Sequence, residues 1–138
     1  MEEIRINEAV VNFKRPNQII NMGGPWVGDL YLGGPKLANN ILIDNLVYNK
    51  NLNKLFFVQY IEISKWQRNN FFTINYFDVR LNRILQYEKK FERIFLKEIS
   101  NEYKCGYYDA FHDENEKHLN TLDLNNIKTS SPALPNEE

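Results

Sequence analysis

The sequence predicts a mainly β protein, an antiparallel meander or sandwich of about six to eight strands joined by hairpins. Residues 41–48, 54–63 and 71–79 are rich in β-branched and aromatic residues and contain neither proline nor glycine, as is typical of strands. A short pattern also occurs twice, at residues 48–56 and 77–85. Aromatic residues make up 14% of the chain and hydrophobic residues 43%, which is enough apolar material for one core.

The repeated pattern has the form of a hairpin tip. In each copy an aromatic run ends at Asn49 or Asp78, passes through a Leu-Asn pair, and resumes at a basic residue followed by two apolar residues. A short polar interruption between two apolar runs is how a hairpin joins its strands. The repeat therefore predicts two hairpins of the same design.

The region before residue 41 predicts short strands separated by turns. Residues 4–13 alternate well enough for a first strand, and Pro16 predicts a turn at residues 14–17 because it pushes its predecessor out of the helical region. Gly-Gly-Pro occurs at 23–25 and again at 33–35. Glycine accepts positive φ and proline fixes its own φ, so each triplet predicts a turn, with a short strand between them.

The alternation within residues 54–63 predicts a central strand that is covered on both sides. One face carries Phe57, Gln59, Ile61 and Ile63, and the other carries Phe56, Val58, Tyr60 and Glu62. Both faces are mostly apolar, which is typical of a strand inside a sandwich.

Residues 81–103 allow two structures. As one helix they place their apolar residues near a single stripe, without any helix breaker. As strands they continue the repeated pattern, with residues 83–91 and 93–100 forming a further hairpin. We favour strands, because the repeat describes whole units whereas the helical stripe is a local pattern. Strand character resumes over residues 104–112.

The chain length of 138 residues fits one domain. We predict that residues 1–124 form a single β-rich domain. After Asp113 the composition becomes polar, and residues 125–138 contain two prolines and few apolar residues. These residues are predicted to form a flexible C-terminal tail.

Charge and cysteine content limit the possible partners and the compartment. The formal net charge is −1, and the lysines and arginines are spread along the chain, so we expect no nucleic-acid partner. Cys105 is the only cysteine, which rules out an intrachain disulfide and suits a reducing compartment. The N-terminus begins acidic, without the apolar segment of a signal peptide, and no apolar stretch is long enough to span a membrane. We therefore expect a cytoplasmic protein without membrane contact. The 20 asparagines suit the codon bias of an AT-rich bacterial genome.

The sequence contains one group of residues that are able to bind a metal or act as a base. His112 and His118, the only histidines, lie among acidic residues between positions 109 and 118. Their spacing matches no familiar zinc motif, so we predict neither a metal nor another cofactor. An enzyme that uses His112 as a base, oriented by Asp109, stays open as an alternative.

Two tryptophans lie beside predicted turns, Trp26 after a Gly-Gly-Pro triplet and Trp66 before a polar segment. An aromatic ring at the base of a loop either plugs the end of a β core or serves as a platform for a sugar or a partner protein. The sequence thus leaves three functions open: a protein-binding module, a domain that binds a glycan or another small ligand, and a small enzyme. We favour the first, because no catalytic constellation or cofactor motif is evident.

Residues 23–113 combine aromatic strand repeats with an acidic, asparagine-rich character, and in this texture the chain resembles the small β-rich immunity proteins that bacteria encode beside polymorphic toxins. The resemblance implies a non-enzymatic protein that binds a cognate toxin and blocks its active site or substrate path. We expect the contacts to come from the aromatic strands and their ends. The predicted contact residues are Trp66, Tyr76, Asp78, Tyr107, Tyr108, Asp109 and His112.

Overall fold

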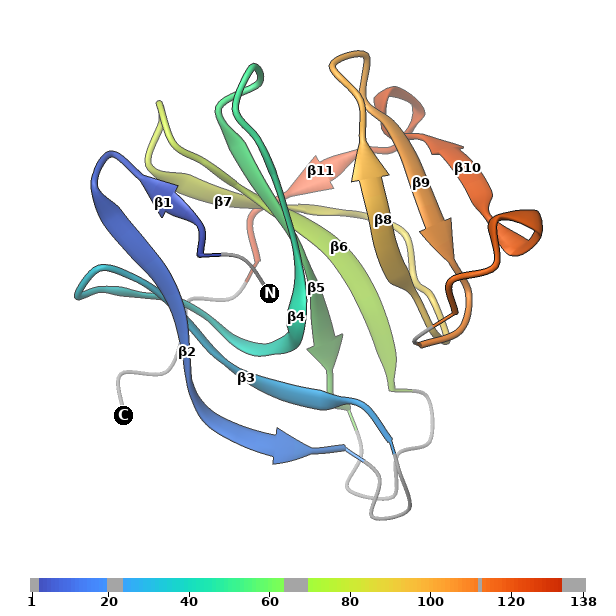
Figure 1. The fold of residues 1–138 in the computed structure, drawn as a ribbon, viewed down its shortest axis with the longest axis horizontal. Coiled ribbons are helices and arrows are strands. Elements are labelled where there is room, and N and C mark those ends of the chain that lie inside the picture. The colour runs from blue at the N-terminus through green and yellow to red at the C-terminus, as the bar shows by residue number, and fades with distance from the viewer. Residues whose placement is uncertain (1–2, 20–23, 64–69, 112, 133–138) are drawn as a thin grey trace.

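The computed structural model describes residues 3–19, 24–63, 70–111 and 113–132. The fold in these ranges is mainly β and its strands pair antiparallel, as predicted (Figure 1). The strands are β1 (Arg5–Ile6), β2 (Ala9–Gln18), β3 (Trp26–Leu32), β4 (Lys36–Asn49), β5 (Lys54–Ile61), β6 (Phe71–Asp78), β7 (Arg83–Tyr87), β8 (Phe95–Ile99), β9 (Lys104–Tyr108), β10 (Asn120–Asp123) and β11 (Thr129–Ser130). Two 3-10 helices, η1 (Glu116–His118) and η2 (Leu124–Asn126), flank β10. The strand number exceeds the predicted six to eight, partly because β1 and β11 have only two residues each.

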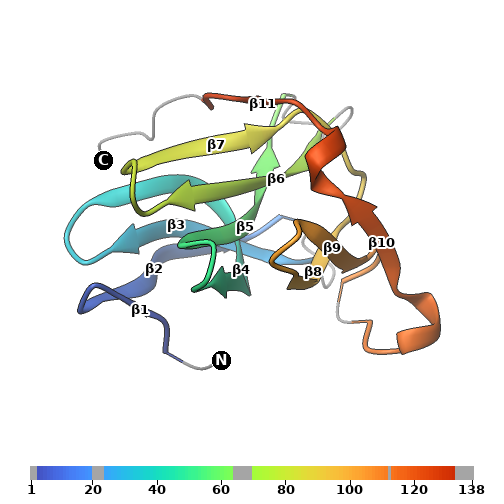
Figure 2. The same cartoon turned by 90° about the horizontal axis from the view of Figure 1, so that it is seen from above.

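The strands form two sheets. The large sheet has the order β1-β2-β3-β4-β5-β6-β7-β11, and the small sheet has the order β10-β9-β8. Figures 1 and 2 show the small sheet to one side of the strongly curved large sheet. Most neighbours in the large sheet are also consecutive in sequence, as in a meander. The exception is β11, which returns from the small sheet to pair with β7.

The core consists of two buried clusters, one on each face of the large sheet. The first lies between the sheets and includes Phe56, Val58 and Tyr60 of β5. The second lies on the opposite, concave face of the large sheet and includes Leu55 and Phe57 of the same strand. All members of the second cluster come from the large sheet, so the sheet buries this face by curling over it. The prediction that residues 54–63 form a central strand covered on both sides is confirmed for β5.

The two predicted hairpin tips have the same local structure. The side chain of Asn49 accepts a hydrogen bond from the Leu52 backbone N–H at 3.0 Å, and Asp78 accepts one from the Leu81 N–H at 3.1 Å. The next residue, Asn53 in the first tip and its counterpart in the second, has positive φ, which asparagine tolerates better than most residues. The repeat in the sequence therefore specifies one kind of turn, used twice.

Asparagine side chains of β4 connect the two sheets. Asn45 is 3% exposed, and its side-chain amide donates to the Leu96 carbonyl at 2.9 Å and accepts from the Leu96 N–H at 2.8 Å. Further along β4, the side-chain amide of Asn49 donates to the Ile99 backbone carbonyl at 3.0 Å. The amide of Asn45 thus takes the place of a partner strand along β8, which fixes the small sheet against the large one.

The segment 81–103 consists of strands, so the helical alternative is wrong. The predicted hairpin within this segment is also wrong, because β7 pairs with β6 while β8 pairs with β9 in the other sheet. Between them the chain passes the start of β6, where Phe91 and Phe72 exchange backbone hydrogen bonds of 2.9 and 2.8 Å. This crossing moves the chain from the large sheet to the small one.

The N-terminal region forms a hairpin and a bulged strand. The expected first strand, residues 4–13, is interrupted by a turn at Asn7 and Glu8, which both have positive φ. The turn expected around Pro16 is instead a bulge within β2, between Lys14 and Asn17. A bulge is one of the few places where a strand accepts proline. The Gly-Gly-Pro turn at 33–35 is confirmed, with positive φ at its first glycine, whereas residue 23 of the other triplet lies outside the described residues.

The chain stays structured beyond residue 124, so the expected tail does not begin at 125. Leu124 is 2% exposed and belongs to the cluster between the sheets, and β11 pairs with Tyr87 and Gln86 of β7. Residues 133–138 lie outside the described part of the chain. Within the described ranges, no helix is long and apolar enough to cross a membrane.

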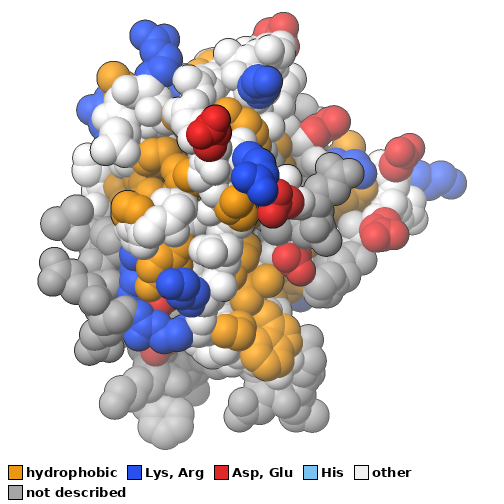
Figure 3. Space-filling view, turned by 60° about the vertical axis from the view of Figure 1, so that its left-hand side comes forward, with side chains coloured by type: hydrophobic (Ala, Val, Ile, Leu, Met, Phe, Trp, Pro, Cys, Tyr) orange, Lys and Arg blue, Asp and Glu red, His pale blue; other side chains and the backbone are white. Residues whose placement is uncertain are grey.

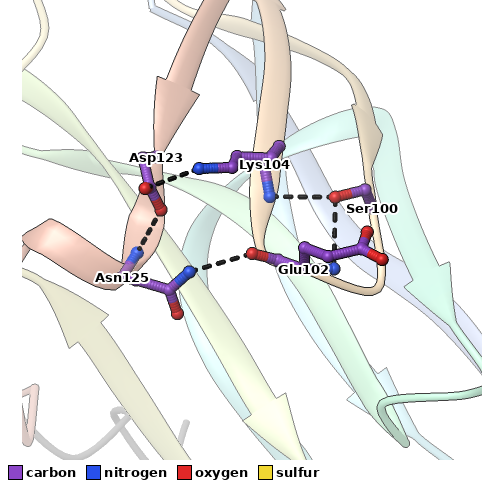
Figure 4. Close-up of polar contacts among 5 residues, drawn as sticks. All are labelled: Ser100, Glu102, Lys104, Asp123 and Asn125. Atoms are coloured by element: carbon purple, nitrogen blue, oxygen red, sulfur yellow. Dashed lines mark hydrogen bonds and ion pairs between the residues drawn. The ribbon is translucent and has the colours of Figure 1, made fainter.

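A third tip, between β8 and β9, is fixed by polar contacts (Figure 4). The Ser100 hydroxyl accepts from the backbone N–H groups of Glu102 and Lys104 at 3.3 and 3.0 Å. The Lys104 ammonium lies 2.6 Å from the Asp123 carboxylate, and Asn125 donates to the Glu102 carbonyl at 2.9 Å. Exposed pairs of this kind contribute little stability singly. Their geometry attaches the third tip to the end of β10.

Candidate functional site

The predicted contact residues do not form one surface. Tyr76 and Tyr108 are 7% and 2% exposed, and Asp78, at 8%, caps a hairpin tip. Tyr107 and Asp109 lie at the end of β9 away from its tip, and only Asp109 is exposed. Trp66 and His112 lie outside the described residues.

Tyr76 belongs to a buried aromatic cluster near the hairpin tips. Its ring lies 5.5 Å from the ring of Tyr87, and the Lys54 ammonium lies 5.0 Å from its centre. The same ammonium donates to the Tyr103 hydroxyl at 2.5 Å. Burial raises the pKa of Tyr76, partly offset by Lys54, and burial raises the pKa of Tyr87 further. These phenols stay protonated at neutral pH and serve packing, with Lys54 enclosed by two rings.

The opposite end of the sandwich carries an apolar pocket. It has a volume of about 540 Å³, within the usual range for ligand pockets. Its lining residues are Pro16, Pro25, Trp26, Leu42, Ile43, Asp44, Phe95 and Phe111. Trp26 is 51% exposed, an unusual position for so large an apolar side chain. Asp44 is the only ionisable residue among the described residues of this lining.

Irregular strand geometry shapes the pocket. The bulge in β2 brings Pro16 to the rim, and the register of β4 shifts between Ile41 and Leu46. Asp44 lies within that shift and has positive φ. Bulges redirect side chains and are frequent beside functional sites. Here the two irregularities contribute Pro16 and Asp44 to the lining of the pocket.

Aromatic residues continue from this pocket along the end of the sandwich. A second cavity of about 270 Å³ shares Pro25 and Phe111 with the first and is also lined by Tyr60 and Phe72. Phe111 packs edge-on against Phe72, with ring centres 5.3 Å apart. We call these two cavities together the end groove. Figure 3 shows one face of the molecule, on which apolar side chains reach the surface in separate groups with basic and acidic side chains among them.

A polar cavity adjoins the end groove and contains two predicted contact residues. It has a volume of about 330 Å³, is lined by Tyr107 and Asp109, and shares Glu92 and Arg93 with the second cavity. Lys89 and Lys90 also line it, and their ammonium groups lie 5.5 and 4.6 Å from the ring centres of Phe91 and Phe71. The described part of this lining therefore holds three basic and two acidic side chains, in contrast to the apolar pocket.

The described residues bring together no catalytic constellation of the predicted kind. The described histidine, His118, pairs through Nδ1 with the Asp113 carboxylate at 2.9 Å. The Asn115 backbone N–H and His118 hold the pKa of Asp113 below its usual range. No three histidine, cysteine or acidic side chains among the described residues are placed to hold a metal ion. Burial raises the pKa of the Cys105 thiol to about 12, so this thiol is a poor nucleophile.

The sequence left Trp26 open as a plug of the β core or as a platform and did not place it among the predicted contact residues, and it gave no sign of Phe95 and Phe111. These two phenylalanines lie on or after strands of the small sheet, and they meet Trp26 only through the packing of the two sheets. A pattern within one segment of the sequence cannot predict that residues of two different sheets lie together. Pro16 gave a usable signal, because proline inside a strand-like run often marks a bulge.

We compared the chain with known proteins. No family model, curated protein or solved structure matches it.

Proposed function

We propose that the protein is a non-enzymatic protein-binding module whose contact surface is the end groove. The observation that carries the proposal is the apolar pocket bordered by the half-exposed Trp26. Interfaces draw most of their affinity from a few aromatic residues around pockets that exclude water. The pocket would receive an apolar side chain of the partner.

The neighbouring polar cavity supports the same proposal. A partner segment that lies along the end groove would bring its next residues to Lys89, Lys90 and Arg93, which favour an acidic side chain. Charged groups at a rim speed association and orient the partner, while the apolar centre supplies affinity. The most specific form of the proposal is an immunity-type protein that binds and neutralises a bacterial toxin. It rests on the resemblance of sequence texture.

The proposal is tested by comparing two alanine variants. The purified protein is used to capture partners from a lysate of its source organism, and the dissociation constant of each captured partner is measured by calorimetry. Trp26→Ala is expected to weaken binding by at least about 2 kcal/mol, roughly 30-fold. Leu81→Ala is the matched control, because Leu81 is 57% exposed at a hairpin tip away from the groove. Equal affinity of the wild type and Trp26→Ala, with both folded, would refute the proposed surface.

The same experiment tests the immunity-type form. The activity of a captured partner is assayed with and without the protein. Inhibition at equal molar ratio, relieved by Trp26→Ala, supports neutralisation. A partner that binds through Trp26 and keeps its full activity would support the protein-binding module but refute the immunity-type function.

A glycan-binding domain is the second candidate, favoured by the exposure of Trp26. A flat indole ring beside a carboxylate such as Asp44 suits the apolar face and hydroxyl groups of a sugar. Titration of the protein with an oligosaccharide panel in a calorimeter distinguishes the candidates. Saturable binding of an oligosaccharide that is lost in Trp26→Ala and kept in Leu81→Ala favours the glycan-binding domain.

A further inference from the structure

Three cavities follow one another along the end of the sandwich. The two cavities of the end groove share Pro25 and Phe111, and the second of them shares Glu92 and Arg93 with the polar cavity. Their volumes, in this order, are about 540, 270 and 330 Å³. Each cavity therefore adjoins the next, and together they form a continuous track instead of one deep hole.

The chemistry of the walls changes along this track. The first cavity is lined mainly by apolar side chains, among them Trp26 and Phe95. The second combines the rings of Tyr60 and Phe72 with the first charged side chains, and the polar cavity is the most highly charged of the three. A partner that follows the track therefore needs an apolar side chain at one end and a charged side chain at the other.

The two lysines of the polar cavity are held in place without being neutralised. The Lys89 ammonium lies 5.5 Å from the ring centre of Phe91, and the Lys90 ammonium lies 4.6 Å from that of Phe71. An aromatic ring attracts a cation through its quadrupole but carries no net charge. Both ammonium groups therefore remain able to attract an anion.

Arg93 adds a third basic group at the point where the second cavity and the polar cavity join. No ion pair within the described residues involves Arg93 or either lysine. Glu92 and Asp109 also line the polar cavity, so its described lining has an excess of one positive charge. The undescribed residues 64–69 and 112 contain no aspartate or glutamate. This excess favours a partner group with a single negative charge, such as a carboxylate.

Contacts within the protein fix the walls of the track before any partner binds. Phe91 and Phe72 exchange backbone hydrogen bonds of 2.9 and 2.8 Å, which join the polar cavity to the second cavity. The ring of Phe91 packs edge-on against Tyr107 at 5.6 Å, and the ring of Phe72 packs edge-on against Phe111 at 5.3 Å. A site that is already ordered loses less entropy when a flexible chain binds to it.

We propose that the partner is held through one linear segment, an extended stretch of chain with a large apolar side chain and, a few residues away, an aspartate or glutamate. The apolar side chain enters the pocket beside Trp26, and the carboxylate binds Arg93 and the two lysines. A row of joined cavities fits successive side chains of an extended chain better than it fits the rounded surface of a folded domain. This inference rests on the proposed function, because it names the part of the partner that the end groove receives.

Selection from a phage library of random peptides tests whether a linear segment is sufficient. Peptides of about twelve residues reach roughly 40 Å when extended, about the width of a domain of this size. The peptides that bind the wild type are expected to share a large apolar residue and an acidic residue. A synthetic peptide with this motif is expected to bind Trp26→Ala at least about tenfold more weakly, as measured by calorimetry.

Two outcomes of the selection would overturn the linear segment: no motif is enriched, or the enriched peptide binds Trp26→Ala as tightly as it binds the wild type. Capture from a lysate also detects a folded partner. Failure of the peptide selection can therefore be distinguished from failure of the proposed function.

A charge swap locates the acidic side chain of the segment. Arg93→Glu is expected to weaken binding of the selected peptide about tenfold, and a peptide with lysine at the acidic position is expected to bind this variant more tightly than the selected peptide does. Lys97→Glu is the matched control, because Lys97 is an exposed residue of β8 that lines none of the three cavities. It should weaken binding less than about twofold, since salt screens distant charges.

Circular dichroism checks that both charge variants are folded. If Arg93→Glu and Lys97→Glu weaken binding of the selected peptide equally, the assigned position of the acidic side chain is wrong.

Discussion

Asparagine is the residue that does most to specify this structure. Among the described residues it occupies four of the eight non-glycine positions with positive φ: Asn7, Asn40, Asn53 and Asn82. Elsewhere its amide joins the two sheets at Asn45, and the amides of Asn39 and Asn75 donate hydrogen bonds to the side chains of Asp29 and Gln59. These are the two properties of asparagine that matter here, a tolerance of left-handed backbone and an amide that both donates and accepts. Codon bias alone does not account for such placement.

The Asn45 amide is the most sensitive of these contacts. Asn45→Ala is expected to lower the free energy of unfolding by about 2–4 kcal/mol, because the Leu96 N–H and carbonyl lose their partner. Urea unfolding followed by circular dichroism measures the change. The control is Asn51→Ala, an exposed asparagine of the β4–β5 tip, which should change stability little. If both variants lower the free energy of unfolding equally, the hydrogen bonds between Asn45 and β8 do not contribute more to stability than an exposed asparagine does.

Hairpin tips are the elements in which sequence and structure agree best. The spacing from the capping residue to the residue with positive φ is local, so the sequence repeat was enough to predict both tips. The tips also meet, since the Val79 N–H donates to the Asn53 carbonyl at 3.1 Å. The third tip escaped prediction because Tyr103 takes the position held by asparagine in the other two.

The cost of positive φ is measurable at Asn53. Asn53→Ala is expected to lower the free energy of unfolding by about 1 kcal/mol, because alanine resists the left-handed conformation. Asn53→Gly should change it by less than about 0.5 kcal/mol, since glycine accepts this φ without strain. Both variants remove the same amide, so their difference isolates the backbone. Equal losses of stability would show that the side chain, and not φ, matters at this position.

At the scale of the whole molecule, the sequence predicted the class of fold but not how the sheets divide. Strand character within residues 81–103 was correctly favoured, yet β7 and β8 belong to different sheets. Such assignments depend on contacts between distant segments, which alternation within one strand does not report. The candidate site shows the same limit, because its aromatic walls come from both sheets.

The shared core predicts that both sheets unfold together. Leu96 and Cys105 of the small sheet are buried in the cluster that also contains Phe56 of the large one. Cys105 is 0% exposed and its thiol has a pKa of about 12, so it should react with iodoacetamide at neutral pH only after unfolding. Labelling of Cys105 and loss of circular dichroism are expected at the same urea concentration. Labelling at a lower concentration would mean that the small sheet opens first.

The edges of the two sheets have a consequence for how copies of the protein meet. β1 and β11, which border the large sheet, are two residues long, and β10 has four residues between two 3-10 helices. At the other border of the small sheet lies β8, whose backbone groups at Leu96 and Ile99 already form hydrogen bonds with the side chains of Asn45 and Asn49. Long unpaired edges are where foreign strands add and amyloid begins. β1 pairs only with Ala9 and Val10, so the rest of β2 is an open edge, but this part of β2 carries Lys14, Arg15 and Pro16 at a bulge, and charges, proline and bulges all oppose the addition of a strand. The described edges are therefore expected to protect this aromatic-rich chain against aggregation.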